Sequence, residues 1–409
     1  MSTLNLFSTG KHWLRLTSLI VLITLVIGQA QTQVAHAATL TVNQTGNQTD
    51  SLDADNICSL IDAIQVANGA TDSDCGTGDA GSDVIVLGNA TYTLKANYGN
   101  GTGLPIITSS ISIEGNGATI ERSSTGGTPQ FRLFWVSTGG ALSLNNVTLR
   151  NGYAIDFNSI GGGIFIDGNG TLTVNNSSLV NNYANGGGGI YDWSAGAVTI
   201  NNTSFSANRG GDGGAIYNRS TELVISNSSF SGNEAGNRGG GIYNFGGTVT
   251  LSNNSFSGNS APNGSGIYNF GTINNNGDLT NDDSITNERT MQNNGPIQNN
   301  GTIQNNDKIY NSCTGTISGN AVNGKTPLGT CVTTTTLTSS LNPSNFGEAV
   351  TFTATVTSAS GTPTGTVTFS IDGVSQAPVS LASGQASFTT SSLSVGAHTI
   401  TASYSGEGA

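Results

Sequence analysis

One short motif recurs at a nearly constant interval, and this repeat constrains the fold more than any other feature of the chain. A complete copy, GGGIYNFGGTVTLSNNSFSGN, runs from Gly239 to Asn259. The isoleucines of the motif stand at Ile164, Ile190, Ile216, Ile242 and Ile267, with spacings of 26, 26, 26 and 25. Its closing apolar residues stand at Leu149, Leu179, Phe205, Phe230 and Phe256, with spacings of 30, 26, 25 and 26. A period in this range predicts a solenoid.

Within each repeat, apolar residues alternate with small polar residues, which is typical of strands with one buried face. Examples are Val249 with Leu251 and, one repeat earlier, Leu223 with Ile225. A single coil cannot bury its own apolar face, but stacked coils share a continuous core. Each repeat is therefore predicted to be one turn of a single-stranded parallel β-helix with about three short strands.

Asparagine and glycine recur at fixed places in the motif. Asparagine stands three positions after the closing apolar residue, at Asn182, Asn208, Asn233 and Asn259. Because asparagine tolerates left-handed backbone geometry, these residues are predicted to form corners between strands. Their stacked amides are also expected to hydrogen-bond from rung to rung. The glycines are expected at corners that need a positive φ.

A second, shorter period begins where the first one ends. Apolar residues then recur at every sixth position, at Ile267, Ile273, Leu279, Ile285, Met291, Ile297, Ile303 and Ile309. If a hexad forms one side of a triangular coil, this segment continues the helix as narrower coils. A disordered Asn-rich tract is the alternative, and the unbroken apolar period favours the coils. The pattern does not determine their handedness.

Two segments resemble known families of bacterial proteins. With GGGIYN, GGAIYN and GSGIYN as signature, residues 140–270 resemble right-handed β-helix repeats of the polymorphic outer-membrane-protein type. Residues 39–120 resemble the N-terminal module that opens on a CSLREA motif, which stands here as CSLIDAIQVAN from Cys58 to Asn68. Ile61 and Asp62 replace the usual Arg-Glu. A short helix is expected here to cap the first coil with one apolar face, formed by Leu60, Ile61, Ile64 and Ala67.

The C-terminal segment has a different composition. AVTFTATVT, GTVTFSIDG and AHTITASYSG alternate like strands, and Asp372-Gly373 is a hairpin signal. Residues 333–409 resemble the bacterial Ig-like domain found in tandem repeats on surface proteins. The resemblance implies a last strand beyond Ala409, so the sequence is expected to be a fragment that lacks further Ig-like repeats or an anchor.

The predicted fold is all-β, with a capping helix, a parallel β-helix and an incomplete Ig-like β-sandwich. The predicted domains are a signal peptide (1–37), a CSLREA-like module with the first coils (38–130), the wide coils that carry the GGGI motif (131–270), Asn-rich hexad coils with a closing disulfide (271–331) and a truncated Ig-like domain (332–409).

The N-terminus and the cysteines indicate export. A basic start, the apolar run Leu16–Ile27 and the Ala35-His36-Ala37 site indicate a cleaved secretory signal, with a membrane anchor as the alternative. Two local cysteine pairs, Cys58–Cys75 and Cys313–Cys331, fit disulfides in an oxidising compartment. Neither pair has metal-ligand spacing, so no metal site or cofactor is predicted. The protein is expected to be secreted or at the cell surface, with no transmembrane segment after signal removal.

The charges are few, and most find a partner on the repeat register. Charged residues make up 9% of the chain against about 25% in typical domains. The net charge of −12 argues against nucleic-acid binding. Asp212 and Arg238 are one period apart, as are Arg209 and Glu234, so each pair is expected to meet across adjacent rungs. Arg219 is expected to stack between two rings, those of Trp193 and Phe245.

Candidate catalytic residues are scarce. Asp167 and Asp192 are the carboxylates left over, and two of them make a weak case for a catalytic pair. His398 is the one histidine outside residues 1–37, so a Ser-His-Asp triad on the repeats is excluded. No catalytic residue is assigned.

The candidate binding site is a column of aromatic residues. Each follows an inward isoleucine and is expected to point outward, and the members are Phe165, Tyr191, Tyr217, Tyr243 and Tyr268. Beside it runs a polar column, Asp192, Asn218, Asn244 and Asn269. An elongated glycan could stack on the rings and hydrogen-bond to the polar groups. The alternative is a ladder of rings that only stabilises the sheet.

Two functions are therefore considered. The first is a secreted or cell-surface structural, adhesin-like protein, whose β-helix presents a binding surface on an Ig-like spacer. Its partner would be an extracellular polysaccharide or a component of a host or neighbouring cell surface. The second is an extracellular polysaccharide-degrading enzyme, a lyase or glycosidase on a pectate-lyase-like β-helix. The fold cannot decide between them, and the sparse, paired charges favour the first.

Overall fold

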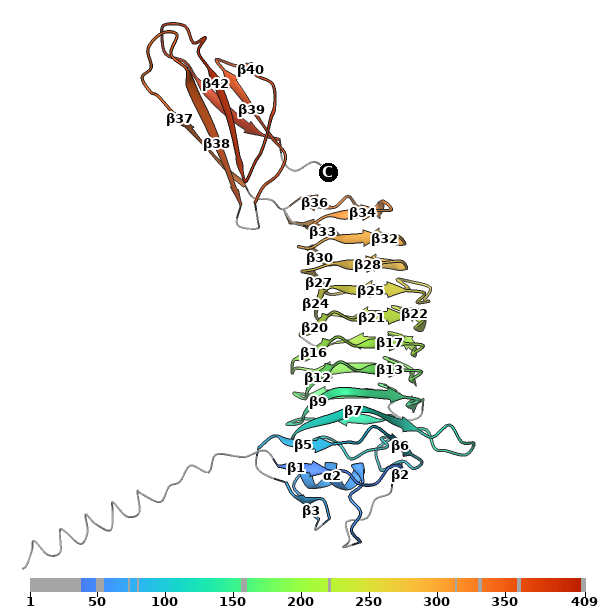
Figure 1. The fold of residues 1–409 in the computed structure, drawn as a ribbon. Helices are drawn as coiled ribbons and strands as arrows, with labels where there is room; N and C mark the ends of the chain where they lie inside the picture. Colours follow the sequence, from blue (N-terminus) through green and yellow to red (C-terminus); the bar gives the residue numbers. More distant parts are fainter. Residues whose placement is uncertain are drawn as a thin grey trace, which may run out of the picture.

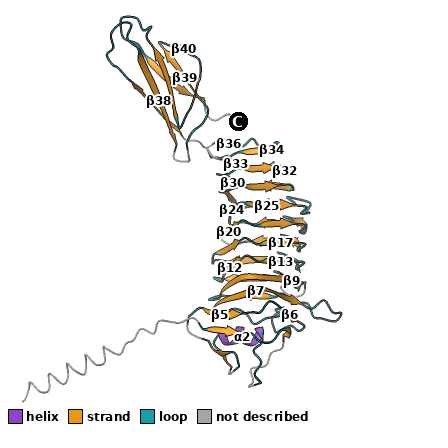
Figure 2. Ribbon diagram, in the orientation of Figure 1, coloured by secondary structure: helices purple, strands orange, loops and turns teal. Residues whose placement is uncertain are grey.

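The computed structural model describes residues 38–48, 55–72, 74–78, 81–155, 160–219, 222–312, 315–329, 333–358 and 362–405. The expected signal peptide and the expected Cys313–Cys331 disulfide lie outside the described residues. Within them, parallel strands stack into a long β-helix, antiparallel strands form a C-terminal Ig-like sandwich, and there is a single helix, α2 (Figures 1 and 2). The predicted fold class is confirmed.

The N-terminal part contains the first coils and the cap. Its elements are β1 (Thr39–Thr41), β2 (Gly46–Gln48), α2 (Leu60–Ala67), β3 (Thr71–Asp72), β4 (Gly76–Thr77), β5 (Asp83–Val86), β6 (Thr91–Leu94) and β7 (Ser110–Arg122). Leu60 and Ile64 of α2 are fully buried, and the helix packs beside β5 and β7 at the N-terminal end of the solenoid (Figure 1). Asp62 completes a capping box, because its Oδ2 accepts from Ser59 N at 3.0 Å while Ser59 Oγ accepts from Asp62 N at 3.1 Å. A disulfide joins Cys58 to Cys75, as predicted.

The wide coils that carry the GGGI motif follow. Their strands are β8 (Phe134–Val136), β9 (Ala141–Arg150), β10 (Tyr153–Ala154), β11 (Ile164–Gly168), β12 (Thr171–Asn175), β13 (Ser178–Val180), β14 (Tyr183–Ala184), β15 (Ile190–Ser194), β16 (Val198–Asn201), β17 (Ser204–Ser206), β18 (Arg209–Asp212), β19 (Ile216–Asn218), β20 (Glu222–Ser226), β21 (Ser229–Ser231), β22 (Glu234–Arg238), β23 (Ile242–Asn244), β24 (Thr248–Ser252), β25 (Asn254–Ser257) and β26 (Ile267–Asn269). Strands one coil apart pair in parallel with repeat positions matched, as Ile190 with Ile216.

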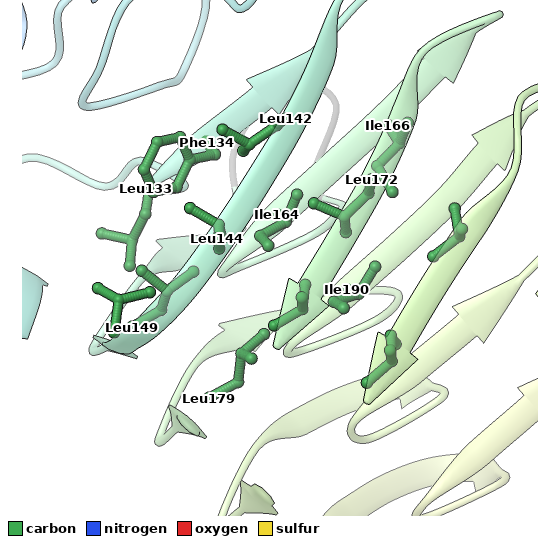
Figure 3. Packing of buried hydrophobic residues seen from close by; sticks show 14 of the residues in the cluster. Leu133, Phe134, Leu142, Leu144, Leu149, Ile164, Ile166, Leu172, Leu179 and Ile190 are labelled. Carbon is green, nitrogen blue, oxygen red and sulfur yellow. The ribbon is translucent and has the colours of Figure 1, made fainter. Parts of the chain in front are cut away.

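A single core fills the solenoid. The inward residues of each strand stack on those of the next coil, and Figure 3 shows Leu142 and Leu172 in neighbouring coils beside Ile164 and Ile190. Three phenylalanines on equivalent strands stack almost face to face. The ring centroids of Phe205 and Phe230 are 4.8 Å apart, and those of Phe230 and Phe256 are 4.6 Å apart. The core is therefore continuous along the axis, as the period predicted.

The glycines of GGGIYN have two different roles. Gly239 has a φ of +63°, which a residue with a Cβ adopts only with strain. Gly240 is required by close approach, because a Cβ there would lie 2.4 Å from the carbonyl oxygen of Ser265 in the next coil. Only the first role was predicted.

The corner asparagines differ from the prediction in one respect. Asn182, Asn208 and Asn233 donate from Nδ2 to Oδ1 of the equivalent asparagine one coil on, at 2.8–3.0 Å, which confirms the ladder. However, the left-handed residue is the one before each ladder asparagine, and these residues are Asn181, Ala207, Gly232 and Gly258. The side chain of each ladder asparagine points inward, and the residue before it adopts the left-handed conformation of the turn.

Ala207 is therefore the strained member of its column. We expect Ala207→Asn to raise the free energy of unfolding by about 1 kcal/mol, because alanine pays a steric cost at φ +52° that asparagine partly avoids. The site is exposed, and its neighbour Asn181 already donates to Asn151 Oδ1 at 2.8 Å. Urea unfolding of the two proteins measures the difference. Ala96→Asn, an exposed site without positive φ, is the control, and an equal gain there would contradict the explanation.

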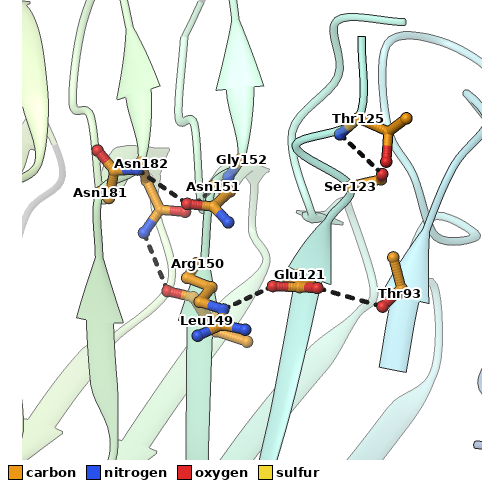
Figure 4. A network of polar contacts seen from close by, with 10 residues as sticks. All are labelled: Thr93, Glu121, Ser123, Thr125, Leu149, Arg150, Asn151, Gly152, Asn181 and Asn182. Atoms are coloured by element: carbon orange, nitrogen blue, oxygen red, sulfur yellow. Dashed lines mark hydrogen bonds and ion pairs between the residues drawn. The ribbon is translucent and has the colours of Figure 1, made fainter. Parts of the chain in front are cut away.

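Cross-rung charge pairs form where the register predicted them. Arg209 Nη2 lies 2.9 Å from Glu234 Oε1, and Arg238 Nη1 lies 3.9 Å from Asp212 Oδ1. Figure 4 shows the same arrangement nearer the N-terminus, where Arg150 Nε lies 2.6 Å from Glu121 Oε2 on the adjacent coil.

The hexad region forms narrow coils, because three hexads complete one turn and Ile273 pairs with Met291. Its strands are β27 (Thr272–Asn275), β28 (Leu279–Asn281), β29 (Ser284–Asn287), β30 (Thr290–Asn293), β31 (Ile297–Asn299), β32 (Thr302–Asn305), β33 (Lys308–Asn311), β34 (Ile317–Gly319), β35 (Val322–Gly324) and β36 (Leu328–Gly329). β27, β28 and β29 pair in parallel with β24, β25 and β26 in turn. The strands of the narrow coils therefore lie on the same faces, in the same order and with the same direction as the strands they pair with. The narrow coils have the same handedness as the wide coils.

The Ig-like domain consists of β37 (Thr333–Ser339), β38 (Val350–Ser358), β39 (Thr366–Ile371), β40 (Val374–Ser375), β41 (Val379–Ser380), β42 (Gln385–Thr390) and β43 (Ile400–Tyr404). β38 pairs with β37 and β42, and β39 pairs with β40, β41 and β43. Phe352 and Phe369 are buried between the two sheets. Asp372-Gly373 joins β39 to β40, as its hairpin signal predicted.

Candidate functional site

The predicted aromatic column is in register but mostly covered. Phe165, Tyr191, Tyr217, Tyr243 and Tyr268 pair in order on β11, β15, β19, β23 and β26. Successive ring centroids are 6.0, 4.5, 4.8 and 5.5 Å apart. Phe165 and Tyr191 are each 6% exposed and Tyr243 is 4% exposed, while Tyr217 and Tyr268 are half-buried. The rings face away from the core, but they are not an open stripe.

Side chains from both sides cover the column. The guanidinium carbon of Arg238 lies 5.8 Å from the Tyr243 ring centroid and 5.6 Å from that of Tyr268. On the other side, the Phe245 ring centroid is 5.9 Å from Tyr243. Burial raises the pKa of Tyr217 and of Tyr243 above the usual value, so both hydroxyls stay protonated at neutral pH. These contacts favour a ladder that stabilises the sheet.

The predicted polar column does not reach the surface, which corrects the expectation for Asp192, Asn218, Asn244 and Asn269. All four are fully buried. Side chains alternate along a strand, so the residue after an outward tyrosine points inward again. Asn218 Nδ2 donates to Asn244 Oδ1 at 2.9 Å, and Asn244 Nδ2 donates to Asn269 Oδ1 at 2.9 Å. Asp192 Oδ1 accepts from Ser194 Oγ at 2.8 Å. These groups are part of the interior.

Exposed side chains lie one position further on at Trp193, Arg219, Phe245 and Phe270, and in the next coil the exposed Arg289 lies two positions after Asn287. We call Trp193, Arg219, Phe245, Phe270 and Arg289 the outer ladder. The Arg219 guanidinium carbon lies 4.6 Å from the Trp193 ring centroid and 5.1 Å from that of Phe245, which confirms the predicted stack. The Phe245 and Phe270 centroids are 6.3 Å apart, and Arg289 lies 4.5 Å from the Phe270 ring. Phe270 and Arg289 were missed, although Phe270 follows IYN as Phe245 does.

A groove of about 700 Å³ opens at the N-terminal end of the outer ladder. It is lined by Trp135, Ile160, Phe165, Asp167, Gly168, Trp193, Ser194 and Ala195. Trp135 Nε1 and Asp167 Oδ1 are buried, and neither has a hydrogen-bond partner in the part of the chain that the structure describes. From the sequence, Asp167 was predicted only as a leftover carboxylate. Trp135 was missed because it lies before the first GGGI motif.

A buried arginine lies next to this groove. Arg132 is 1% exposed, and its guanidinium carbon is 4.9 Å from the Phe165 ring centroid and 5.5 Å from that of Trp135. Burial lowers the pKa of Arg132 to about 10, while the charge of Asp167 acts in the opposite direction. Arg132 is therefore a cation at neutral pH.

Asp167 and Asp192 do not form a pair. Asp192 is in register with Ile166, while Asp167 is in register with Trp193. The two carboxylates therefore point to opposite faces of one sheet, Asp192 into the core and Asp167 outward. Among the described residues, no group of three or more His, Cys, Asp or Glu could hold a metal ion. None of the described helices could span a bilayer.

The match to known families covers two parts of the chain. Residues 132–268 match the family model of the right handed beta helix region. This segment is a right-handed β-helix. Residues 337–409 match the bacterial Ig-like domain of group 3. No curated protein matches the chain. The matches do not extend to the CSLREA-like module or to the polymorphic type of the repeats, and both stay predictions.

Proposed function

We propose that this chain is a secreted or cell-surface, adhesin-like protein whose right-handed β-helix binds a glycan along the outer ladder, with the Ig-like domain as spacer. A β-helix region joined to a bacterial Ig-like domain fits a surface or extracellular protein. One observation supports the binding surface above all. Among the described residues of 131–270, the exposed large apolar side chains are Trp193, Phe245 and Phe270, and all three are in the outer ladder.

The chemistry of the ladder suits an extended sugar chain. The apolar faces of sugar rings stack on aromatic rings, and Trp193 is 53% exposed. Arg219 is held between two rings, so it loses little side-chain freedom when it donates hydrogen bonds. Adjacent rungs are about 4.8 Å apart, so five rungs give a surface roughly 20 Å long. This length accommodates several sugar units.

The enzymatic alternative has less support. Hydrolysis of a glycosidic bond by acid–base chemistry needs two carboxylates that flank the bond. Asp167 and Asp192, the two candidates, lie on opposite faces of the sheet. A polysaccharide-degrading enzyme stays an outcome of the test below.

The test uses protein lacking residues 1–37 and a panel of immobilised polysaccharides, with retention and released products both measured. We expect retention without products. Trp193→Ala and Phe245→Ala should each weaken binding at least tenfold, because each ring contributes about 1.5–3 kcal/mol when covered. Phe346→Ala, at a 78% exposed site in the Ig-like domain, is the matched control and should bind normally.

Two results would count against the proposal. Release of shorter products would identify an enzyme instead. Equal retention of the Phe245→Ala and Phe346→Ala proteins would show that the outer ladder is not the binding surface.

A further inference from the structure

We propose that the groove beside Trp193 is a subsite for one neutral hexopyranose unit of the bound glycan. The ring would stack on Trp193, and its hydroxyls would hydrogen-bond to Trp135 Nε1 and Asp167. This inference rests on the proposed function. It adds where on the protein the glycan is recognised and which class of sugar the glycan contains.

The position of the groove connects it to the outer ladder. Asp167 and Trp193 are register partners on β11 and β15, and Trp193 belongs to both the groove and the ladder. β11 and β15 each contain five residues, whereas β19, β23 and β26 contain three. The two additional residues are Asp167 and Gly168 on β11 and Trp193 and Ser194 on β15, and all four line the groove. The additional residues of these two coils therefore form the groove, and a glycan bound along the outer ladder would extend into it at Trp193.

The polar atoms of the groove favour a ligand that both donates and accepts hydrogen bonds. Trp135 Nε1 is a donor and Asp167 Oδ1 is an acceptor, and both are buried without a hydrogen-bond partner among the described residues. A buried polar group without a partner is unfavourable, so a ligand that pairs with both gains affinity. A sugar hydroxyl donates one hydrogen bond and accepts others, so adjacent hydroxyls of one pyranose can satisfy both atoms.

The charges around the groove favour a neutral sugar. A uronate carboxylate would face the carboxylate of Asp167, and like charges repel. Arg132 lies next to Asp167 and offsets its charge, so a cationic sugar would gain little from Asp167. The cation of Arg132 lies beneath the rings of Trp135 and Phe165 and, unlike Trp135 and Asp167, does not line the groove, so it offers a uronate no direct partner there.

The tryptophans give a direct readout. Trp13 lies in residues 1–37, so protein lacking that segment contains only Trp135 and Trp193, and both line the groove. The probes are hexasaccharides of a glucan, a mannan and a galactan, with hexagalacturonate as the acidic counterpart. We expect at least one neutral hexasaccharide to shift the tryptophan emission and to bind at least tenfold more tightly than hexagalacturonate.

Three variants test the roles of the polar atoms. Trp135→Phe keeps a ring but removes the N–H group, and should weaken the neutral probe about three- to tenfold. Asp167→Ala should weaken it at least tenfold. Asp167→Asn keeps an acceptor and removes the charge, so it should bind the neutral probe within about threefold of wild type and bind hexagalacturonate more tightly. Thermal unfolding identifies any misfolded variant, and the conservative Trp135→Phe keeps the test decisive in that case.

The outcomes separate the groove from the proposed function. Suppose that retention of polysaccharide depends on Phe245, but that Trp135→Phe and Asp167→Asn bind every probe as tightly as wild type does. The groove is then not a subsite, and the proposal that the outer ladder binds a glycan is unaffected. Tighter binding of hexagalacturonate than of every neutral probe by wild type overturns the assignment of a neutral sugar. If no polysaccharide is retained at all, the proposed function fails and the inference fails with it.

Discussion

Replacement of Asn233 by leucine is expected to lower the free energy of unfolding by about 4 kcal/mol or more, although the side chains are of similar size. Asn233 Oδ1 accepts from the backbone N and from Nδ2 of Asn208, both at 3.0 Å. Its Nδ2 donates to Phe205 O at 3.0 Å and to Asn259 Oδ1 at 2.8 Å. Leucine leaves these four contacts unmade in a fully buried corner. Each buried polar group without a partner costs about 1–3 kcal/mol.

Urea unfolding followed by circular dichroism measures this loss. Asn237→Leu is the matched control, because Asn237 is exposed in the adjacent strand β22, and it should change stability by less than about 0.5 kcal/mol. A loss in Asn233→Leu no larger than in the control would mean that the ladder is not needed for stability.

The ladders explain how a solenoid this narrow remains stable. A hexad side of the narrow coils contributes one buried apolar residue, such as Ile273, Leu279 or Ile285, and one buried asparagine. The asparagines form three parallel ladders, with Nδ2 to Oδ1 distances of 2.9 Å from Asn275 to Asn293 and 2.8 Å from Asn281 to Asn299. Amide stacking therefore supplies interior contacts that a small apolar cross-section cannot supply alone.

Much of the fold could be predicted from the sequence because a solenoid repeats its contacts at a fixed interval. The inward isoleucines, the phenylalanine stack, the pair Arg209–Glu234 and the stack around Arg219 all follow from residue spacing. Strand alternation also requires Asn218 to point inward, and this was missed because the residue next to an outward ring was treated as its surface neighbour.

The remaining features of the site depend on geometry that the spacing does not contain. Tyr243 is covered because Arg238 lies over its ring, which depends on the path of a long side chain from another sheet. The groove depends on the longer strands β11 and β15 and on Arg132 and Trp135. Arg132 and Trp135 precede the first GGGI motif, so alignment of the motifs could not reveal them.

Phe230→Ala is expected to lower the free energy of unfolding by about 3–5 kcal/mol, because Phe230 is fully buried and its ring stacks on both Phe205 and Phe256. Phe245→Ala removes the same ring from a site that is 39% exposed, and should cost about 1 kcal/mol or less. The two variants should therefore separate stability from binding. The folded Phe230→Ala protein should retain glycan binding while unfolding at lower urea, whereas Phe245→Ala should lose binding and keep its stability. If both variants lost stability equally, the outer ladder would be part of the structural core, and a binding role for its exposed rings would have no support.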